Sequence, residues 1–222
     1  DQILEVKKFY YNNKLDHQTR ALINFDGTEF TNMSQSIVKG DITNPKFYLR
    51  LYEAAGNAEL SEEYKLIVNP ISQSWVEGTG KLGDDPKNTN GCSWENRSNP
   101  IGGNNVSWSK AGSFNKNGPT VITGSTNEGT QSFSNESPDI NMEVTNVVNN
   151  WLNGTNKNYG FLLRFSGSQE TNETTFGHLK FFSRNTHTIF SPRLEVRWDD
   201  HLPCTGSNTG SLNELTMSGL AD

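Results

Sequence analysis

The chain has 222 residues, a formal net charge of −6 and a sequence pI of about 5.3. This acidity argues against a general nucleic-acid surface or a surface for anionic membranes. Apolar residues make up only 32% of the chain, but twelve Phe, six Tyr and five Trp supply large areas for burial. No stretch approaches the roughly 20 apolar residues of a membrane span. The length suits one large all-β domain.

Alternating apolar and polar residues predict half-buried antiparallel strands. In residues 47–52, Phe47, Leu49 and Leu51 point to one face, whereas Tyr48, Arg50 and Tyr52 point to the other. The same alternation, or a less regular form of it, marks residues 3–11, 20–25, 64–68, 159–165, 178–183 and 193–198. The strands predict an antiparallel β-sandwich with jelly-roll-like connections.

One segment has the period of a helix. Val147, Val148, Trp151 and Leu152 recur at helical spacing, Thr145 is an acceptable N-cap, and a glycine follows at 154. We therefore expect one short α-helix over residues 146–153 that closes one end of the sandwich.

Two regions lack a regular period. Residues 78–129 are rich in Gly, Asn, Ser and Asp, which is typical of long loops, with short strands expected around Trp94, Val121 and Phe133. After Trp198 the strand pattern stops. We expect a sandwich over residues 1–198 and a linker or extended arm over residues 199–222, which can lead into a further domain.

The glycine-rich loops contain the candidate metal ligands. Asp84, Asp85, Asn88 and Asn90 offer oxygen atoms to Ca²⁺, but their spacing does not match an EF-hand loop, and such residues also cap turns. Glu77 and the two aspartates lack the burial that would raise the pKa of a catalytic acid. The sequence therefore predicts no enzyme and no cofactor.

Exposed aromatic rings are the second kind of candidate site. Tyr48, Tyr52, Trp108 and Phe114 could stack on a sugar or lie in an interface with another subunit. Trp75 and Trp94 are expected to anchor the long loop to the core.

The cysteines and histidines do not form a recognisable metal-binding motif. Cys92 and Cys204 are far apart in sequence, so both a disulfide and two reduced thiols stay open. The four histidines, at positions 17, 178, 187 and 201, have no ligand spacing with each other or with the cysteines.

Charged residues in the later strands are expected on the outer face of the sheet. They would form exposed cross-strand ion pairs or contacts between subunits. This set comprises Arg164, Lys180, Arg184, Arg193, Glu195 and Arg197. Glu170 and Glu173 are expected in a solvated loop between two strands.

Several motifs in order resemble the DNRLRE, or carbohydrate-binding-module-96-like, β-sandwich. They are RALINFD (20–26), SQSWVEGTG (72–80), GCSWENR (91–97), MEVTNVVNNWLNG (142–154), NYGFLLRF (158–165) and SPRLEVRW (191–198). The resemblance covers residues 3–198. It implies one more strand before this segment, so we expect the chain to be processed or part of a longer product.

A finer resemblance concerns residues 44–54 and 167–200. These segments are similar to virion structural proteins of marine T4-like tailed phages, where the sandwich is one module of a longer chain. This implies a structural part of a phage particle (tail, neck or collar, baseplate, or head decoration).

The partners implied are other virion proteins and further copies of the chain, without nucleic acid or membrane. The alternative is a carbohydrate-binding sandwich of a secreted or surface bacterial protein, which would bind a surface glycan outside the cell.

Overall fold

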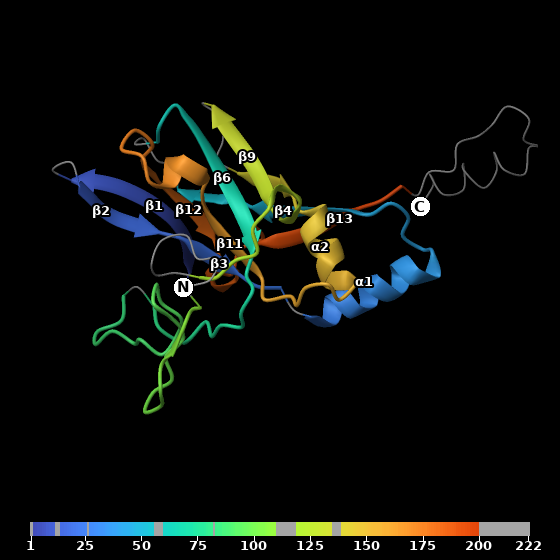
Figure 1. Cartoon of the computed structure of the whole chain (residues 1–222), viewed down its shortest axis with the longest axis horizontal. Helices are drawn as coiled ribbons and strands as arrows, with labels where there is room; N and C mark the ends of the chain where they lie inside the picture. The colour runs from blue at the N-terminus through green and yellow to red at the C-terminus, as the bar shows by residue number, and fades with distance from the viewer. Residues whose placement is uncertain are drawn as a thin grey trace, which may run out of the picture.

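The computed structural model describes residues 2–11, 14–25, 27–55, 60–81, 83–109, 119–134 and 139–199. Figure 1 shows two packed layers of antiparallel strands with two helices at one end. The strands are β1 Ile3–Tyr11, β2 Lys14–Thr19, β3 Ala21–Ile23, β4 Lys46–Leu51, β5 Glu53–Ala55, β6 Glu63–Pro70, β7 Asn96–Ser98, β8 Val106–Ser107, β9 Gly129–Ser134, β10 Ile140–Glu143, β11 Phe161–Phe165, β12 Gly177–Phe182 and β13 Arg193–Arg197. The helices are α1 Gly27–Lys39 and α2 Thr145–Leu152, with short 3₁₀ turns η1 Ser125–Asn127, η2 Gly167–Glu170 and η3 Arg184–Thr186.

Three sheets build the sandwich. Their strand orders are β2-β1-β12-β5, β10-β4-β13 and β3-β11-β6-β9, and every pairing is antiparallel. Strands β4 and β5 are consecutive in the chain but belong to different sheets, so the chain passes from one sheet to the next at Tyr52. The all-β sandwich is confirmed, whereas the jelly-roll connectivity stays a prediction.

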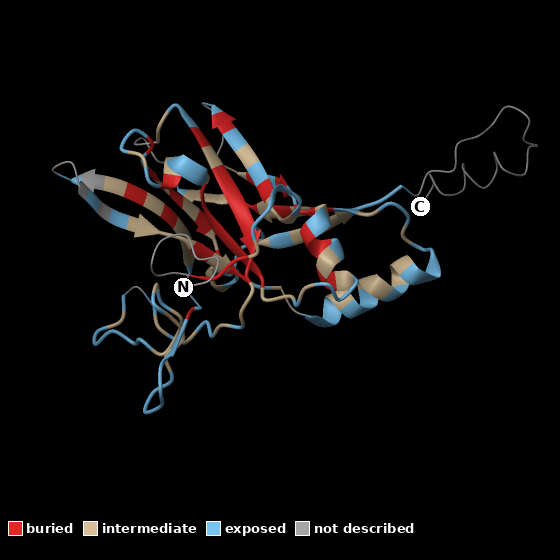
Figure 2. Ribbon diagram, in the orientation of Figure 1, coloured by how far each residue is buried: buried red, intermediate tan, exposed pale blue. Residues whose placement is uncertain are grey.

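The main core lies between these sheets. Phe47, Leu49 and Leu51 of β4 are fully buried, as the alternation predicted, and pack in one cluster with Phe161 of β11 and Phe181 of β12. Red segments in Figure 2 follow the same strands. Exposed residues concentrate in the loops and on α1.

Strand β11 is buried on both faces, which corrects the expectation of one polar face. All five of its residues are buried, and Arg164 is only 2% exposed. A second, smaller core cluster explains this burial. Leu162 faces away from the main core and packs with Ile71, Trp108 and Val121.

The two helices cover one end of the sandwich. Helix α2 buries Val147, Val148 and Trp151, as predicted. Thr145 does not act as the N-cap. Its hydroxyl instead accepts a hydrogen bond from the Phe47 amide at 3.0 Å, and Val144 holds the cap position.

Helix α1 was missed in the sequence. Its signal is present, because Phe30, Met33 and Ile37 recur at helical spacing and pack against the main core. The Phe30 ring meets the Trp151 indole edge-to-face, with centroids 5.8 Å apart. Asn, Thr and Ser between these positions obscure the pattern, since they are weak helix formers.

The long glycine-rich segment forms a compact lobe over residues 72–109, which we call the loop lobe. Figure 1 shows it extending from the sandwich on a different side from the two helices. Its two arms cross closely, because a Cβ on Gly78 would lie 2.4 Å from the Gly91 Cα. Only glycine fits there. Short strands β7 and β8 pair inside the lobe.

Candidate functional site

A groove runs between the sandwich and the loop lobe. It has a volume of about 840 Å³, and an adjoining hollow of about 570 Å³ shares Leu4, Thr19, Arg20 and Leu22 with it. The groove is lined by Trp75 and Trp94 from the lobe and by polar side chains that include Glu29, Glu77 and Arg184. This mixture of indole rings, carboxylates and a guanidinium suits a polar ligand with apolar patches.

The two tryptophans are held in place by the sandwich. The Trp75 indole Nε1 donates a hydrogen bond of 2.8 Å to the Tyr159 carbonyl, and its ring packs against the second core cluster. The Arg20 guanidinium lies over the Trp94 ring, 4.4 Å from its centroid. Both rings therefore anchor the lobe, as expected, and both keep some surface in the groove.

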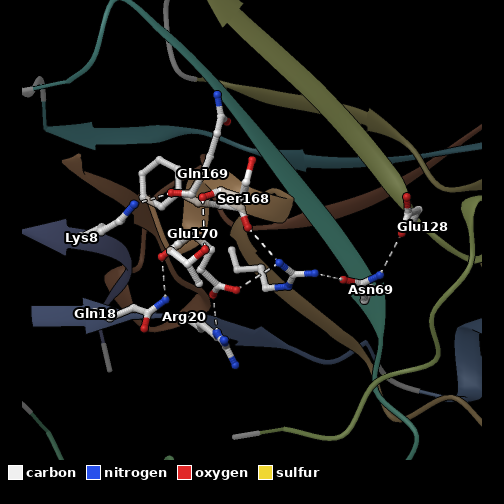
Figure 3. Close-up of polar contacts among 11 residues, drawn as sticks. Lys8, Gln18, Arg20, Asn69, Glu128, Ser168, Gln169 and Glu170 are labelled. Atoms are coloured by element: carbon white, nitrogen blue, oxygen red, sulfur yellow. Dashed lines mark hydrogen bonds and ion pairs between the residues drawn. The ribbon is translucent and has the colours of Figure 1, made fainter. Parts of the chain in front are cut away.

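Arg20 joins the groove to a buried charge cluster (Figure 3). Its Nε lies 2.6 Å from Glu170 Oε1, and Arg164 Nη1 lies 3.1 Å from the other carboxylate oxygen. All three side chains are at most 4% exposed. Arg164 also donates to the Asn69 amide oxygen at 3.2 Å. The carboxylate thus separates two cations on the outer face of neighbouring strands.

This arrangement corrects two expectations. Arg164 points to the outer face of β11 but is buried there and not exposed, and Glu170 is buried in η2 and not in a solvated loop. Glu173 is exposed, as expected. Arg164 and Glu170 are both buried because η2 folds over the outer face of β11 and brings Glu170 against Arg164. Burial lowers the pKa of the Arg164 guanidinium, and the negative charge of Glu170 opposes that effect.

Lys8 ties the same loop to the first sheet. Its side chain is fully buried, and its Nζ donates to the backbone carbonyls of Gln169 and Asn172. Burial lowers the pKa of Lys8 to about 8, although the charge of Glu170 acts in the opposite direction. Together these contacts fix residues 166–175 against three strands. The charge cluster therefore has a structural role, because it attaches this loop to the sandwich beside the groove.

The candidate Ca²⁺ ligands lie in the loop lobe, where several of their polar atoms form hydrogen bonds within the lobe, and Asp84 lines the hollow beside β1 and β3. Asp84 Oδ2 accepts a hydrogen bond from the Lys81 amide at 2.8 Å, and Asn90 Oδ1 accepts one from the Thr79 amide at 2.8 Å. Asn88 Oδ1 accepts from the Asn90 amide at 3.2 Å. Asp85 is exposed. Within the described ranges, no group of three or more His, Cys, Asp or Glu residues could hold a metal ion.

Of the four candidate platform aromatics, the structure describes Tyr48, Tyr52 and Trp108. Trp108 is only 6% exposed and belongs to the second core cluster, so its expected role as an exposed ring is wrong. Tyr48 and Tyr52 are half-buried on the outer face of β4, and Arg197 lies 3.9 Å from the Tyr48 ring centroid. Phe114 lies outside the described residues.

Of the remaining candidates, Cys92 and Arg184 line the groove. The Cys92 thiol is free and half-buried, and burial raises its pKa to about 11. Cys204 and His201 lie outside the described residues. His178 Nε2 is 3.1 Å from Glu5 Oε1, and His187 adopts a left-handed backbone conformation with φ of 53°.

The comparisons with known proteins give no relative. No protein-family model matches the chain, and no curated protein or solved structure matches it. None of the helices in the described ranges is long and apolar enough to cross a membrane. Function must therefore be argued from the fold and from the contacts above.

Proposed function

We propose that this chain is a non-enzymatic structural component of a tailed-phage virion, a sandwich that contacts other virion proteins through its loops. The observation that carries the proposal is the loop lobe, which a rigid sandwich holds out in a fixed conformation. Loops positioned by a rigid scaffold are a common basis of recognition. The resemblance to phage virion proteins agrees with this reading.

Residues of the sequence motifs support the proposal by what they do in the fold. Trp75 binds the Tyr159 carbonyl, Gly78 permits the close crossing of the two arms, and Gly160 approaches the backbone of Ile23. These residues build and attach the lobe. The motif residues therefore stabilise the fold. The tips of the loop lobe are left for contacts with other proteins. Ile101, at one tip, is 84% exposed.

The location proposed is the phage particle, in its tail, neck or collar, baseplate or head decoration. The carboxylates of the lobe are unsuited to glycoside hydrolysis, because Glu77 and Asp85 are exposed and Asp84 holds a turn. A general acid of that kind needs an environment that raises its pKa.

The experiment compares the assembly state of residues 1–222 with that of residues 1–200. Light scattering and negative-stain images should show defined oligomers, rings or fibres for the full chain and weaker assembly for the shortened chain. A stable monomer that instead binds a polysaccharide would contradict the proposal.

The groove favours a second candidate function, a carbohydrate-binding module of a secreted or surface bacterial protein. Trp75 and Trp94 offer indole surface beside carboxylate and guanidinium groups, which together can stack on a sugar ring and bind its hydroxyls.

A panel of polysaccharides tests this candidate. Binding that is lost in Trp94→Ala and kept in Tyr48→Ala would assign the glycan to the groove. Tyr48 is the matched control, because its ring is also half-buried beneath an arginine but lies outside the groove.

A further inference from the structure

The outer face of the sheet β10-β4-β13 carries an unusual set of side chains. Strands β4 and β13 pair Arg193 with Arg50 and Glu195 with Tyr48, while Phe47, Leu49 and Leu51 point into the core. The outward residues of these two strands form what we call the arginine face. It comprises Tyr48, Arg50, Tyr52, Arg193, Glu195 and Arg197.

Two of the three arginines on this face lie close to one carboxylate, that of Glu195. Arg197 Nε lies 2.7 Å from Glu195 Oε1, and Arg50 Nε lies 3.9 Å from Glu195 Oε2. The hydrogen bond from Arg197 lowers the pKa of Glu195, and the charges of all three arginines act in the same direction. Arg193 instead donates to the Ile189 carbonyl at 2.7 Å. The face therefore has more positive than negative charge.

Aromatic rings lie among these charges. Arg197 covers the Tyr48 ring and also reaches Asn141 Oδ1 on β10 at 3.2 Å. The Tyr52 ring packs on Phe190 at 5.4 Å, and Phe190 and Ile189 remain 44% and 74% exposed. Tyrosine, phenylalanine and arginine are the residues enriched where protein interfaces gain most of their affinity.

Negative charge is concentrated next to one end of the arginine face. Asp139 Oδ1 accepts a hydrogen bond from the Glu53 amide at 2.7 Å, directly after Tyr52. Burial and the charge of Asp139 raise the pKa of Glu53. Asp139 directly precedes Ile140, which pairs with Leu51, so Glu53 and Asp139 form what we call the acidic rim at this end of the arginine face.

We propose that two copies of this chain dimerise through the arginine face, with the arginines of each copy against the acidic rim of the other. A two-fold interface requires a self-complementary surface, and a face with arginines along it and carboxylates at one end meets that requirement. This inference deepens the proposed function, since it names a second copy as one partner.

The test uses the full chain and two double variants. Arg193→Glu with Arg197→Glu, and Glu53→Lys with Asp139→Lys, each place like charges in contact in a homodimer. Sedimentation at low salt should show a wild-type dimer and about tenfold or greater weakening in each variant. An equimolar mixture of the two variants should restore the dimer, because every contact in the mixed pair is again between opposite charges.

The matched control is Lys81→Glu with Lys157→Glu, which changes the net charge as much as the arginine variant at exposed sites away from this face. It should dimerise like the wild type, and circular dichroism should show all variants folded. A wild-type chain that is monomeric at low salt would overturn the inference, and so would equal loss in the control or a mixture that stays monomeric.

Different results would overturn the virion role and the arginine-face dimer. Assembly that is lost on removing residues 201–222 but unchanged by Arg193→Glu with Arg197→Glu would overturn the arginine-face dimer and leave the virion role standing. A wild-type monomer that binds no polysaccharide would likewise overturn the dimer alone, because the virion role also rests on contacts with other proteins.

Discussion

Glu170 is the residue on which the buried charge cluster depends. Its two oxygens separately contact Arg20 and Arg164, and no more than 4% of any of the three side chains is exposed. We expect Glu170→Gln to lower the free energy of unfolding by about 3 kcal/mol, because it leaves two buried cations without their counter-charge.

Urea denaturation measures this loss, and Glu173→Gln is the control on the same loop. Glu173 is exposed, so its substitution should change the free energy of unfolding by less than about 0.5 kcal/mol. Equal effects of the two substitutions would show that the cluster does not stabilise the fold.

A second prediction concerns Tyr64, whose substitution should not destabilise the fold. Its ring stacks on Phe133 with centroids 4.8 Å apart, but its buried hydroxyl has no hydrogen-bond partner among the described residues. Burial raises the pKa of Tyr64 to about 12. Tyr64→Phe keeps the stack and removes an unsatisfied polar atom, so thermal or urea unfolding should show no loss and up to about 1 kcal/mol of gain. A loss above that amount would reveal a partner for the hydroxyl.

Strands and helices could be predicted from the sequence where the spacing of apolar residues gave one clear pattern. The alternation in residues 47–52 fixed both the strand and its buried face, and the spacing of Val147, Val148 and Trp151 fixed α2 within one residue. Helix α1 was missed because Asn, Thr and Ser weaken its pattern. The burial of Arg164 was missed because period 2 tells which residues share a face, but not that a distant segment, η2, covers that face.

The groove could not be predicted for a similar reason. Its walls come from β2, β3, the loop lobe and the segment around η3, which are far apart in sequence and meet only after folding. The sequence did indicate Trp75 and Trp94 as anchors. It gave no sign that Trp108 is a core residue, because a tryptophan within a glycine-rich stretch has no periodic neighbours.

Gly160 tests how closely β11 must approach β3. Its φ is +84°, and a Cβ there would lie 2.2 Å from the Ile23 carbonyl oxygen. Gly154 has a similar φ of +76° but has open space around it. Both alanine substitutions carry the backbone strain of about 1 kcal/mol, and Gly160→Ala should cost clearly more because it adds a clash with backbone. Equal unfolding midpoints for the two variants would contradict this packing.

At the scale of the whole molecule, the sandwich should be stable without the C-terminal segment. Every described strand and both core clusters lie within residues 3–197. We expect deletion of residues 201–222 to change the free energy of unfolding by less than about 0.5 kcal/mol, measured by urea denaturation. A collapse of stability would mean that this segment belongs to the core and is no separate arm.

We propose that the whole molecule is an assembly module. A sandwich with two core clusters holds the loop lobe through Trp75 and Trp94. A different surface, the arginine face, is the one we propose to contact a second copy.

Labelling of purified phage particles tests the central claim most directly. Antibodies raised against the recombinant chain, detected with gold in electron micrographs of particles from the source of this sequence, should mark one substructure at a constant position. Particles that carry no label when intact and no such polypeptide when disrupted would contradict the virion role and leave the carbohydrate-binding module as the reading to pursue.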